Sequence, residues 1–186
     1  MYKFIYDKFN NWYRDGTIYL YSDPHFSDEE MKYLRKNYIG DEDQIKRINS
    51  KVNYKDTIIF LGDIGDPEKV KKIRGYKVLI MGNHEAGATK YKEYFDEVYE
   101  GPLFISDRIL LSHEPIDFPY ALNIHGHDHL KSTFQDELHI NLCAENIDYT
   151  PVLLKNIVMS GKLKNIKSIH RDTIDKAVER KLEKIS

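Results

Sequence analysis

Histidine and carboxylate side chains gather in five short segments of this 186-residue chain. The segments read YSDPHF, LGDIGD, MGNHE, LSHEP and HGHDH, and each follows a run of apolar residues. They hold six of the eight histidines: His25, His84, His113, His125, His127 and His129. Imidazole, carboxylate and amide ligands without sulfur suit Mn, Fe, Zn, Co or Ni. The residue types therefore indicate a metal site, provided that the fold brings the segments together.

The candidate ligands are too many for one ion. Two ions about 3.5–4 Å apart, bridged by a carboxylate, would use all of them. Asp63 follows a predicted strand alone and has two acceptor oxygens, so it is the natural bridge. Asp23 and His25 are two positions apart, which makes both point one way from an extended strand end. His127 and His129 repeat this spacing. The full predicted ligand set is Asp23, His25, Asp63, Asn83, His113, His127 and His129.

Apolar and β-branched segments predict buried strands immediately before the polar segments. These strands are expected at 17–22, 57–62, 77–82, 121–126 and 137–142, with a hairpin formed by 103–105 and 108–112. Open α/β sheets place their binding sites at the carboxyl ends of the strands. The predicted strands would therefore carry the five polar segments to one edge of the fold.

Helical spacing and capping residues predict helices among these strands. They are expected at 27–39, 41–52, 66–74 and 88–95, and from Thr150-Pro151 onward. A final amphipathic helix is expected at 172–185, with a stripe made of Ile174, Ala177, Val178, Leu182 and Ile185. Early alternation of strands and helices, followed by consecutive strands, predicts an α/β layered fold with two packed sheets.

Composition narrows the class of protein. The length fits one domain, and 41% hydrophobic with 31% charged residues is typical of a soluble globular chain. The formal charge of −2 gives no basic footprint for strong non-specific binding to nucleic acid. Cys143 is the only cysteine, which excludes an internal disulfide and a thiolate metal cage. The amino terminus has no long apolar run, so we expect no signal peptide, no membrane span and a cytoplasmic location.

The motif order D-x-H, G-D, G-N-H-[DE], H and G-H-x-H resembles the signature of the calcineurin-like metallophosphoesterases. Here the motifs read Asp23-Pro24-His25, Gly62-Asp63, Gly82-Asn83-His84-Glu85, His113 and Gly126-His127-Asp128-His129. The order of predicted elements is similar to that of small bacterial and phage members. The resemblance implies two packed mixed β-sheets flanked by helices, with residues 1–161 as the metallophosphoesterase domain. Residues 162–186, a Lys-rich link and the amphipathic helix, are expected to pack on the same domain.

The resemblance also assigns roles to single residues. The first ion would be held by Asp23, His25, Asp63 and His129, and the second by Asp63, Asn83, His113 and His127. His84 would not bind metal but would contact the phosphate and stabilise or protonate the leaving oxygen, so the expected catalytic residues are His84 and Asp63. The expected cofactors are two divalent ions, with Mn favoured over Fe, Zn, Ni or Co. The expected reaction is hydrolysis of a phosphodiester, or of a monoester, by in-line attack of a hydroxide held between the ions.

The substrate is less closely defined. The motifs leave no room for a cap domain between His113 and His127, which predicts an open site for a small phosphodiester or nucleotide. One alternative is a nuclease that acts on DNA or RNA ends. Another is a non-catalytic scaffold on the same fold, although a scaffold is expected to lose ligands and this chain keeps them. No membrane partner is expected.

Four other polar residues near the motifs have simpler expected roles. Asp66 precedes Pro67 and is expected to cap the helix that begins there. His125 lies outside the G-H-x-H unit and is expected to be a strand residue rather than one that orients a ligand. Glu85 and Asp128 are expected to accept hydrogen bonds from nearby backbone or ligand groups.

Overall fold

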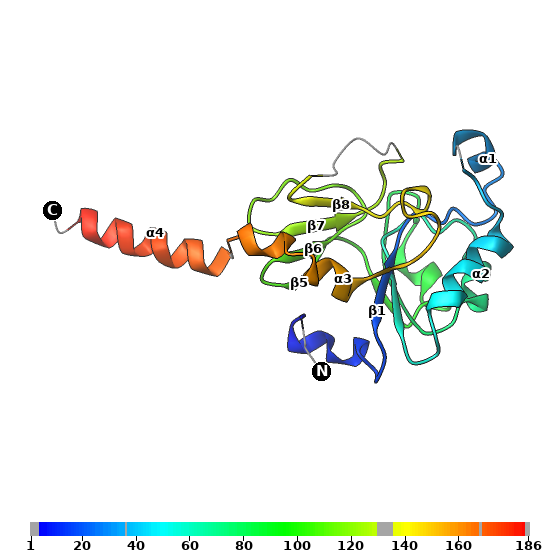
Figure 1. The fold of residues 1–186 in the computed structure, drawn as a ribbon, viewed down its shortest axis with the longest axis horizontal. Helices are drawn as coiled ribbons and strands as arrows, with labels where there is room; N and C mark the ends of the chain where they lie inside the picture. Colours follow the sequence, from blue (N-terminus) through cyan, green and yellow to red (C-terminus); the bar gives the residue numbers. More distant parts are fainter. Residues whose placement is uncertain (1–3, 36, 130–135, 168, 185–186) are drawn as a thin grey trace.

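Two mixed β-sheets form the centre of the fold in this computed structural model, which describes residues 4–35, 37–129, 136–167 and 169–184 (Figure 1). The first sheet has the strand order β4-β3-β2-β1-β9: Glu97–Tyr99, Tyr76–Ile80, Thr57–Phe60, Ile18–Tyr21 and Val152–Leu153. The second has the order β5-β6-β7-β8: Leu103–Ser106, Ile109–Leu111, Leu122–His125 and His139–Asn141. The expectation of an α/β fold with two mixed sheets flanked by helices is confirmed.

Strand direction sets where the polar segments can meet. Strands β1 to β4 run parallel, and β9 is antiparallel to β1. In the second sheet, β5 and β6 form an antiparallel hairpin, while β6, β7 and β8 run parallel. A bridge between Ser22 and Cys143 joins the chain just after β1 to the chain just after β8. The carboxyl ends of the central strands of both sheets therefore meet at one edge.

Alternate residues of the central strands pack into two apolar clusters, as the twofold period of a strand requires. Ile59 of β2 points into the cluster shared by the two sheets, where it joins Leu20 and Ile124. Its neighbours Ile58 and Phe60 point into a second cluster on the other face of the first sheet. A strand that is apolar on both faces is typical of a parallel sheet covered on both sides.

Four α-helices and five 3₁₀ helices accompany the sheets in the described part of the chain. The α-helices are α1 Met31–Leu34, α2 Asp41–Lys51, α3 Leu154–Met159 and α4 Ile169–Glu183. The 3₁₀ helices are η1 Asp7–Trp12, η2 Pro67–Lys72, η3 Ala88–Tyr91, η4 Ala144–Ile147 and η5 Lys162–Asn165. Helix α2 covers the outer face of the first sheet through Ile45 and Ile48. None of the helices in these described ranges is both long enough and apolar enough to cross a membrane.

The helix predicted at 27–39 is wrong over most of its length, since only α1, Met31–Leu34, is α-helical. Ser27 has a left-handed backbone with φ 62°, which interrupts any helix that starts there. Arg35 is extended, with φ −103° and ψ 123°, and its side chain turns inward instead of following a helix surface. A tertiary contact therefore overrides the local helical pattern.

Several further elements differ from the sequence-based expectations. The helices expected at 66–74 and 88–95 are short 3₁₀ helices, η2 and η3, and strand β4 follows η3 where no strand was predicted. The helix expected from Thr150-Pro151 starts only at Leu154, because Val152 and Leu153 first pair with β1 as strand β9. Short elements depend more on tertiary pairing than on local propensity, which explains these differences.

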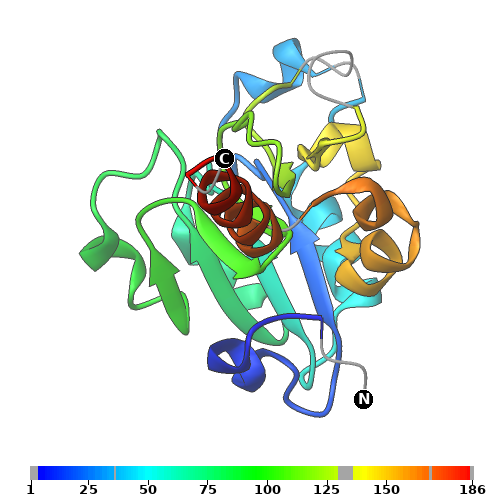
Figure 2. The same ribbon diagram turned by 90° about the vertical axis from the view of Figure 1, so that its left-hand side faces the viewer.

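Helix α4 projects away from both sheets, as Figures 1 and 2 show. Its apolar residues Ile174, Val178 and Leu182 are 57%, 53% and 62% exposed, so the expected packing of this stripe on its own domain is not seen. Ile185, which was expected to extend the stripe, lies outside the described residues. The link before α4 is anchored by Ile166, which is buried in the core between the sheets. Beyond this anchor, Asp172 and Lys176 hydrogen-bond with the Tyr120 hydroxyl.

The packing predicts that two aliphatic truncations have very different effects on stability. Ile59→Ala should lower the free energy of unfolding by about 2–5 kcal/mol, because it leaves a cavity between the sheets. Val178→Ala should change it by less than about 0.5 kcal/mol, because that side chain is largely in solvent. Urea denaturation of both variants measures the difference. A large loss in Val178→Ala would show that the α4 stripe is covered in solution.

Candidate metal centre

The predicted ligands all follow strand ends at the edge where the sheets meet. Four of them, Asp23, His25, Asp63 and His127, have left-handed backbone, with φ of 54°, 46°, 51° and 65°. Such φ values are uncommon outside glycine and cluster where function requires an unusual turn. Strands β1, β2 and β7 are therefore each followed by a sharp turn that carries ligand residues.

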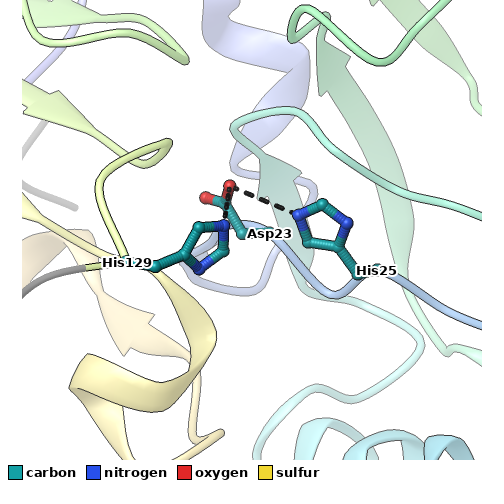
Figure 3. A group of neighbouring side chains, drawn as sticks. All are labelled: Asp23, His25 and His129. Carbon is teal, nitrogen blue, oxygen red and sulfur yellow. Dashed lines mark ion pairs between the residues drawn. The ribbon is translucent and has the colours of Figure 1, made fainter. Parts of the chain in front are cut away.

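Asp23, His25 and His129 form the first cluster, called the Asp23 group below (Figure 3). The Nε2 atoms of His25 and His129 lie 3.9 and 3.7 Å from Asp23 Oδ1. Asp23 is fully buried, whereas the His129 side chain is 36% exposed. One carboxylate oxygen thus faces two imidazole nitrogens, an arrangement that suits a divalent cation at their centre.

Asp63, His113, His127 and Asn83 form the second cluster, called the Asp63 group. His113 Nε2 lies 3.4 Å from Asp63 Oδ1 and 2.9 Å from Asn83 Oδ1. His127 Nδ1 lies 3.1 Å from both Asn83 Oδ1 and His113 Nε2. Two imidazole nitrogens and two side-chain oxygens thus converge, and this donor set suits the same metals.

Asp63 stands between the two groups. Its Oδ2 lies 3.5 Å from His25 Nε2 in the Asp23 group, and its Oδ1 faces His113 Nε2 in the other. The residue is 2% exposed, so its charge is almost fully removed from water. One buried carboxylate with an oxygen toward each cluster has the geometry that a bridging ligand needs.

Hydrogen bonds orient the ligand side chains. His113 Nδ1 lies 2.8 Å from the Leu61 carbonyl oxygen, which can only accept. Nδ1 therefore carries the proton, and the lone pair of Nε2 points into the Asp63 group. His25 Nε2 is buried and makes no hydrogen bond within the described part of the chain. A buried nitrogen without a partner is costly, and a bound cation would satisfy it.

Glu85 and Asp66 support the loop that carries Asp63. The Glu85 carboxylate accepts hydrogen bonds from the backbone N–H groups of Asp63, Ile64 and Gly82. The expectation that Glu85 accepts from nearby backbone is thereby confirmed. Asp66 caps η2 by accepting from the Glu68 N–H, which confirms its expected role.

Sequence reasoning missed two charged residues beside the Asp23 group, Arg35 and Glu145. The Glu145 carboxylate accepts from His129 Nδ1 at 2.7 Å and lies 3.3 Å from Arg35 Nε. Arg35 Nη2 donates to the Asp23 carbonyl at 2.7 Å. Glu145 follows a predicted strand, as the ligands do, and this position was the available signal. Arg35 gave no signal, because an arginine in a predicted helix is normally expected to face solvent.

These charges change the proton affinities of the two histidines in opposite directions. Burial and then the Arg35 charge lower the pKa of His25. Burial also acts to lower the pKa of His129, but the Glu145 hydrogen bond and the Asp23 and Glu145 charges outweigh it and raise that pKa. The pKa of Glu145 is lowered, because its contacts with His129 and Arg35 overcome the effect of burial.

Cys143 and Ser22 line the buried side of Asp23. Cys143 Sγ and the Ser22 hydroxyl both reach Asp23 Oδ2. Burial, followed by the nearby Asp23 and Glu145 charges, raises the pKa of the Cys143 thiol far above its usual range. His129, Cys143 and Glu145 also place possible ligand atoms within 4.8 Å of one another. The Arg35 cation next to Glu145 opposes a second positive charge in that third cluster.

The remaining histidines of the polar segments lie outside the two groups. The His84 side chain is 62% exposed, and its Nε2 is 3.9 Å from Asp63 Oδ2. His84 belongs to neither of the two ligand groups, and the expectation that it does not bind metal stays a prediction. His125 is buried in β7, with Nδ1 2.8 Å from the Gly126 carbonyl. Its place in a strand and outside both groups agrees with its expected structural role. The Asp128 carbonyl accepts from the Asn141 side chain.

An open groove adjoins the Asp63 group. Its volume is about 240 Å³, and its walls include Asn83, His113, Glu100 and Glu114. The lining residues within the described part of the chain include two carboxylates and no lysine or arginine. The groove can therefore take a small polar group, but its charge opposes a chain of phosphates.

Comparisons with known proteins give a similar fold but no information on the reaction. No protein-family description matches the sequence, and no curated protein does. A similar crystal structure is that of AQ665, a protein of unknown function from Aquifex aeolicus, with 25% sequence identity and a TM-score of 0.64. The match covers 77% of this chain and 98% of that one. The seven ligand assignments thus stay predictions, although the structure brings all seven side chains to one place.

Gly126 tests how tightly the centre is built. A Cβ at this position would collide with the Ser22 side chain and the Asp23 carboxylate. Gly126→Ala should therefore displace Asp23, lower the free energy of unfolding by about 1–3 kcal/mol through overpacking, and weaken Mn²⁺ binding in calorimetric titration.

Gly101→Ala is the matched control, because a Cβ there meets nothing within 4 Å. It should bind Mn²⁺ as the unmodified chain does. Equal Mn²⁺ affinity in the two variants would contradict the close packing of Gly126 on Asp23.

Proposed function

We propose that this chain is a dinuclear metal-dependent phosphoesterase of the calcineurin-like metallophosphoesterase superfamily. The observation that carries the proposal is the position of Asp63, whose two carboxylate oxygens face two separate clusters of imidazole and oxygen ligands. The ligands come from five sequence motifs in the order that the superfamily uses. The two mixed sheets, with these motifs at their carboxyl ends, are consistent with that fold.

The residues present suit two divalent cations. Asp23, His25 and His129 would hold one ion and Asn83, His113 and His127 the other, with Asp63 shared between them. The unpartnered His25 Nε2 and the fixed tautomer of His113 support this arrangement. Nitrogen and oxygen donors without a thiolate favour Mn, with Fe, Zn, Ni or Co as alternatives. When bound, such ions supply a hydroxide at neutral pH and polarise the phosphoryl oxygens.

His84 would provide an imidazole that is not bound to metal and can contact the substrate. Its imidazole is exposed beside Asp63 and is not held within either cluster, so it is free to meet a substrate phosphate. As an imidazolium it would offset negative charge on a phosphoryl oxygen or give its proton to the leaving oxygen. The backbone N–H of His84 donates to Asp63 Oδ1, so the same residue also orients the carboxylate.

The groove beside the Asp63 group favours a small phosphodiester or nucleotide as substrate. Glu100 and Glu114 in its wall would repel the phosphates that flank the scissile bond in a nucleic acid. A leaving group that is neutral or that donates hydrogen bonds fits this wall better. A diester also carries less charge into the acidic groove than a monoester does.

The proposal is tested by hydrolysis of bis-p-nitrophenyl phosphate and p-nitrophenyl phosphate. Metal-free protein should be inactive, and added Mn²⁺ should produce cleavage, with the diester preferred. Asp63→Ala should abolish cleavage, because both clusters lose a shared ligand. If Mn²⁺ binds but neither ester is cleaved, a non-catalytic role on the same fold becomes the better explanation. Preferred cleavage of oligonucleotide ends would instead support a nuclease.

Replacement of His84 separates metal binding from turnover. His84→Ala should keep both ions, since His84 lies outside the ligand clusters, and should lose about 10²–10⁴-fold in turnover. Metal analysis together with steady-state kinetics measures both quantities. His170→Ala, a change on exposed α4, is the control and should behave as the unmodified chain. Full activity in His84→Ala would remove this histidine from the mechanism.

A further inference from the structure

Arg35 is a buried cation that the reaction proposed above does not use. The residue is 4% exposed, although an arginine side chain normally keeps its charged end in water. Its Nη2 donates to the Asp23 carbonyl, and its Nε lies 3.3 Å from Glu145 Oε2. The other oxygen of Glu145 accepts from His129 Nδ1. One guanidinium is thereby linked to two ligands that are far apart in the sequence.

We propose that Arg35 is a positioning residue for the Asp23 group, which it holds in its ligating arrangement through Glu145 and the Asp23 backbone. The inference rests on the proposed function, because it assigns Arg35 to one of the two metal sites. The Asp63 group has no comparable link to Arg35 among the contacts of the described residues. The expected consequence is selective. Loss of Arg35 should weaken the binding of the ion at the Asp23 group and leave the binding of the other ion unchanged.

The first step runs from Glu145 to His129. Since the Glu145 carboxylate accepts from Nδ1, that nitrogen carries the proton and Nε2 presents its lone pair toward Asp23. The His129 side chain is 36% exposed, so packing alone does not fix the direction of its ring. The carboxylate therefore selects both the tautomer and the direction of the ring.

The second step runs from Arg35 to Glu145 and Asp23. Glu145 is only 12% exposed in its side chain, so its charge needs a nearby cation. Arg35 supplies that cation, and its planar fork reaches the Asp23 carbonyl at the same time. The carbonyl belongs to a residue with left-handed φ, which a donor at this point helps to hold in place. A lysine, with a single charged nitrogen, would not reproduce both contacts.

A purely structural role is the competing explanation, since Arg35 also ends α1. That role predicts lower stability with unchanged metal affinities. The neighbouring Arg47 offers a matched comparison, because it too reaches the segment after β8, where it pairs with Asp148. Within the described part of the chain, Arg47 forms no ion pair or hydrogen bond with Glu145 or with the Asp23 group.

The experiment titrates metal-free protein with Mn²⁺ by calorimetry and records the electron paramagnetic resonance spectrum. The unmodified chain should bind two ions with a spin-coupled spectrum. Arg35→Met should bind one of them about 10–100-fold more weakly, a typical effect of removing a group that orients a ligand. At intermediate Mn²⁺ its spectrum should show the hyperfine pattern of isolated Mn²⁺. Arg47→Met should match the unmodified chain in both measurements.

Two results would overturn the inference. One is a folded Arg35→Met variant that binds both ions with unchanged affinity. The other is an equal loss of affinity for both ions, which would show a general disturbance of the site. If Arg35→Met fails to fold because Glu145 is left buried and unpaired, Arg35→Met/Glu145→Leu removes both charges. This double variant should show the same selective loss, and unchanged affinities in it would also refute the role of Arg35.

The same titration separates this inference from the proposed function. If the unmodified chain binds no Mn²⁺ or other divalent ion, the dinuclear centre itself is wrong. If it binds two ions and cleaves the diester while Arg35→Met does the same with equal affinities, only the inference about Arg35 fails.

Discussion

The burial of two carboxylates, Asp23 and Asp63, is the constraint on which the rest of this edge of the molecule depends. Both are almost fully removed from water at the junction of the two sheets. A buried charge is stable only when hydrogen bonds and opposite charges surround it. Here the His127 N–H donates to Asp23 and the His84 N–H to Asp63, while the histidines and Arg35 supply positive charge or ligand atoms. The groups that form the ligand clusters therefore also stabilise the buried carboxylates, and with them this part of the fold.

The sharp turns after the strands follow from that constraint. A backbone N–H can reach a carboxylate on a neighbouring loop only if the chain bends immediately after its strand. Left-handed φ at Asp63 and His127 provides such bends, and small residues let the loops approach. At Gly82, an added Cβ would collide with Asp63 Oδ1 and His113. The glycines of the G-N-H and G-H-x-H motifs are thus explained by close packing against the buried carboxylates.

Much of this arrangement could be predicted, because the ligand residues follow strands with strong apolar patterns. Each strand fixes where its loop begins, and the loops are too short to carry Asp63 or His113 elsewhere. Glu145 and Arg35 could not be predicted in the same way. Their roles depend on contacts between the segment after β8 and a loop more than a hundred positions earlier. The same kind of contact shortened α1 and turned residues 152–153 into β9.

Helix α4 shows a second limit of predictions that are based on hydrophobic periodicity. Its apolar stripe indicates a buried face, yet Ile174 and Val178 lie in solvent. Periodicity shows which residues share a face but not what covers it. Asp172 and Lys176 of α4 hydrogen-bond with the Tyr120 hydroxyl. Such a polar contact leaves no trace in the hydrophobic period of the helix.

The bridge between Ser22 and Cys143 and the pairing of β9 with β1 have a consequence for the order of assembly. Asp23, His25 and Asp63 leave the ribosome early, but the segment that completes their surroundings is synthesised late. Until the segment after β8 docks, Asp23 lacks Cys143, which contacts it on its buried side. A nascent chain thus carries an incomplete centre, and the finished one arises only when the carboxyl-terminal part of the domain joins the first sheet.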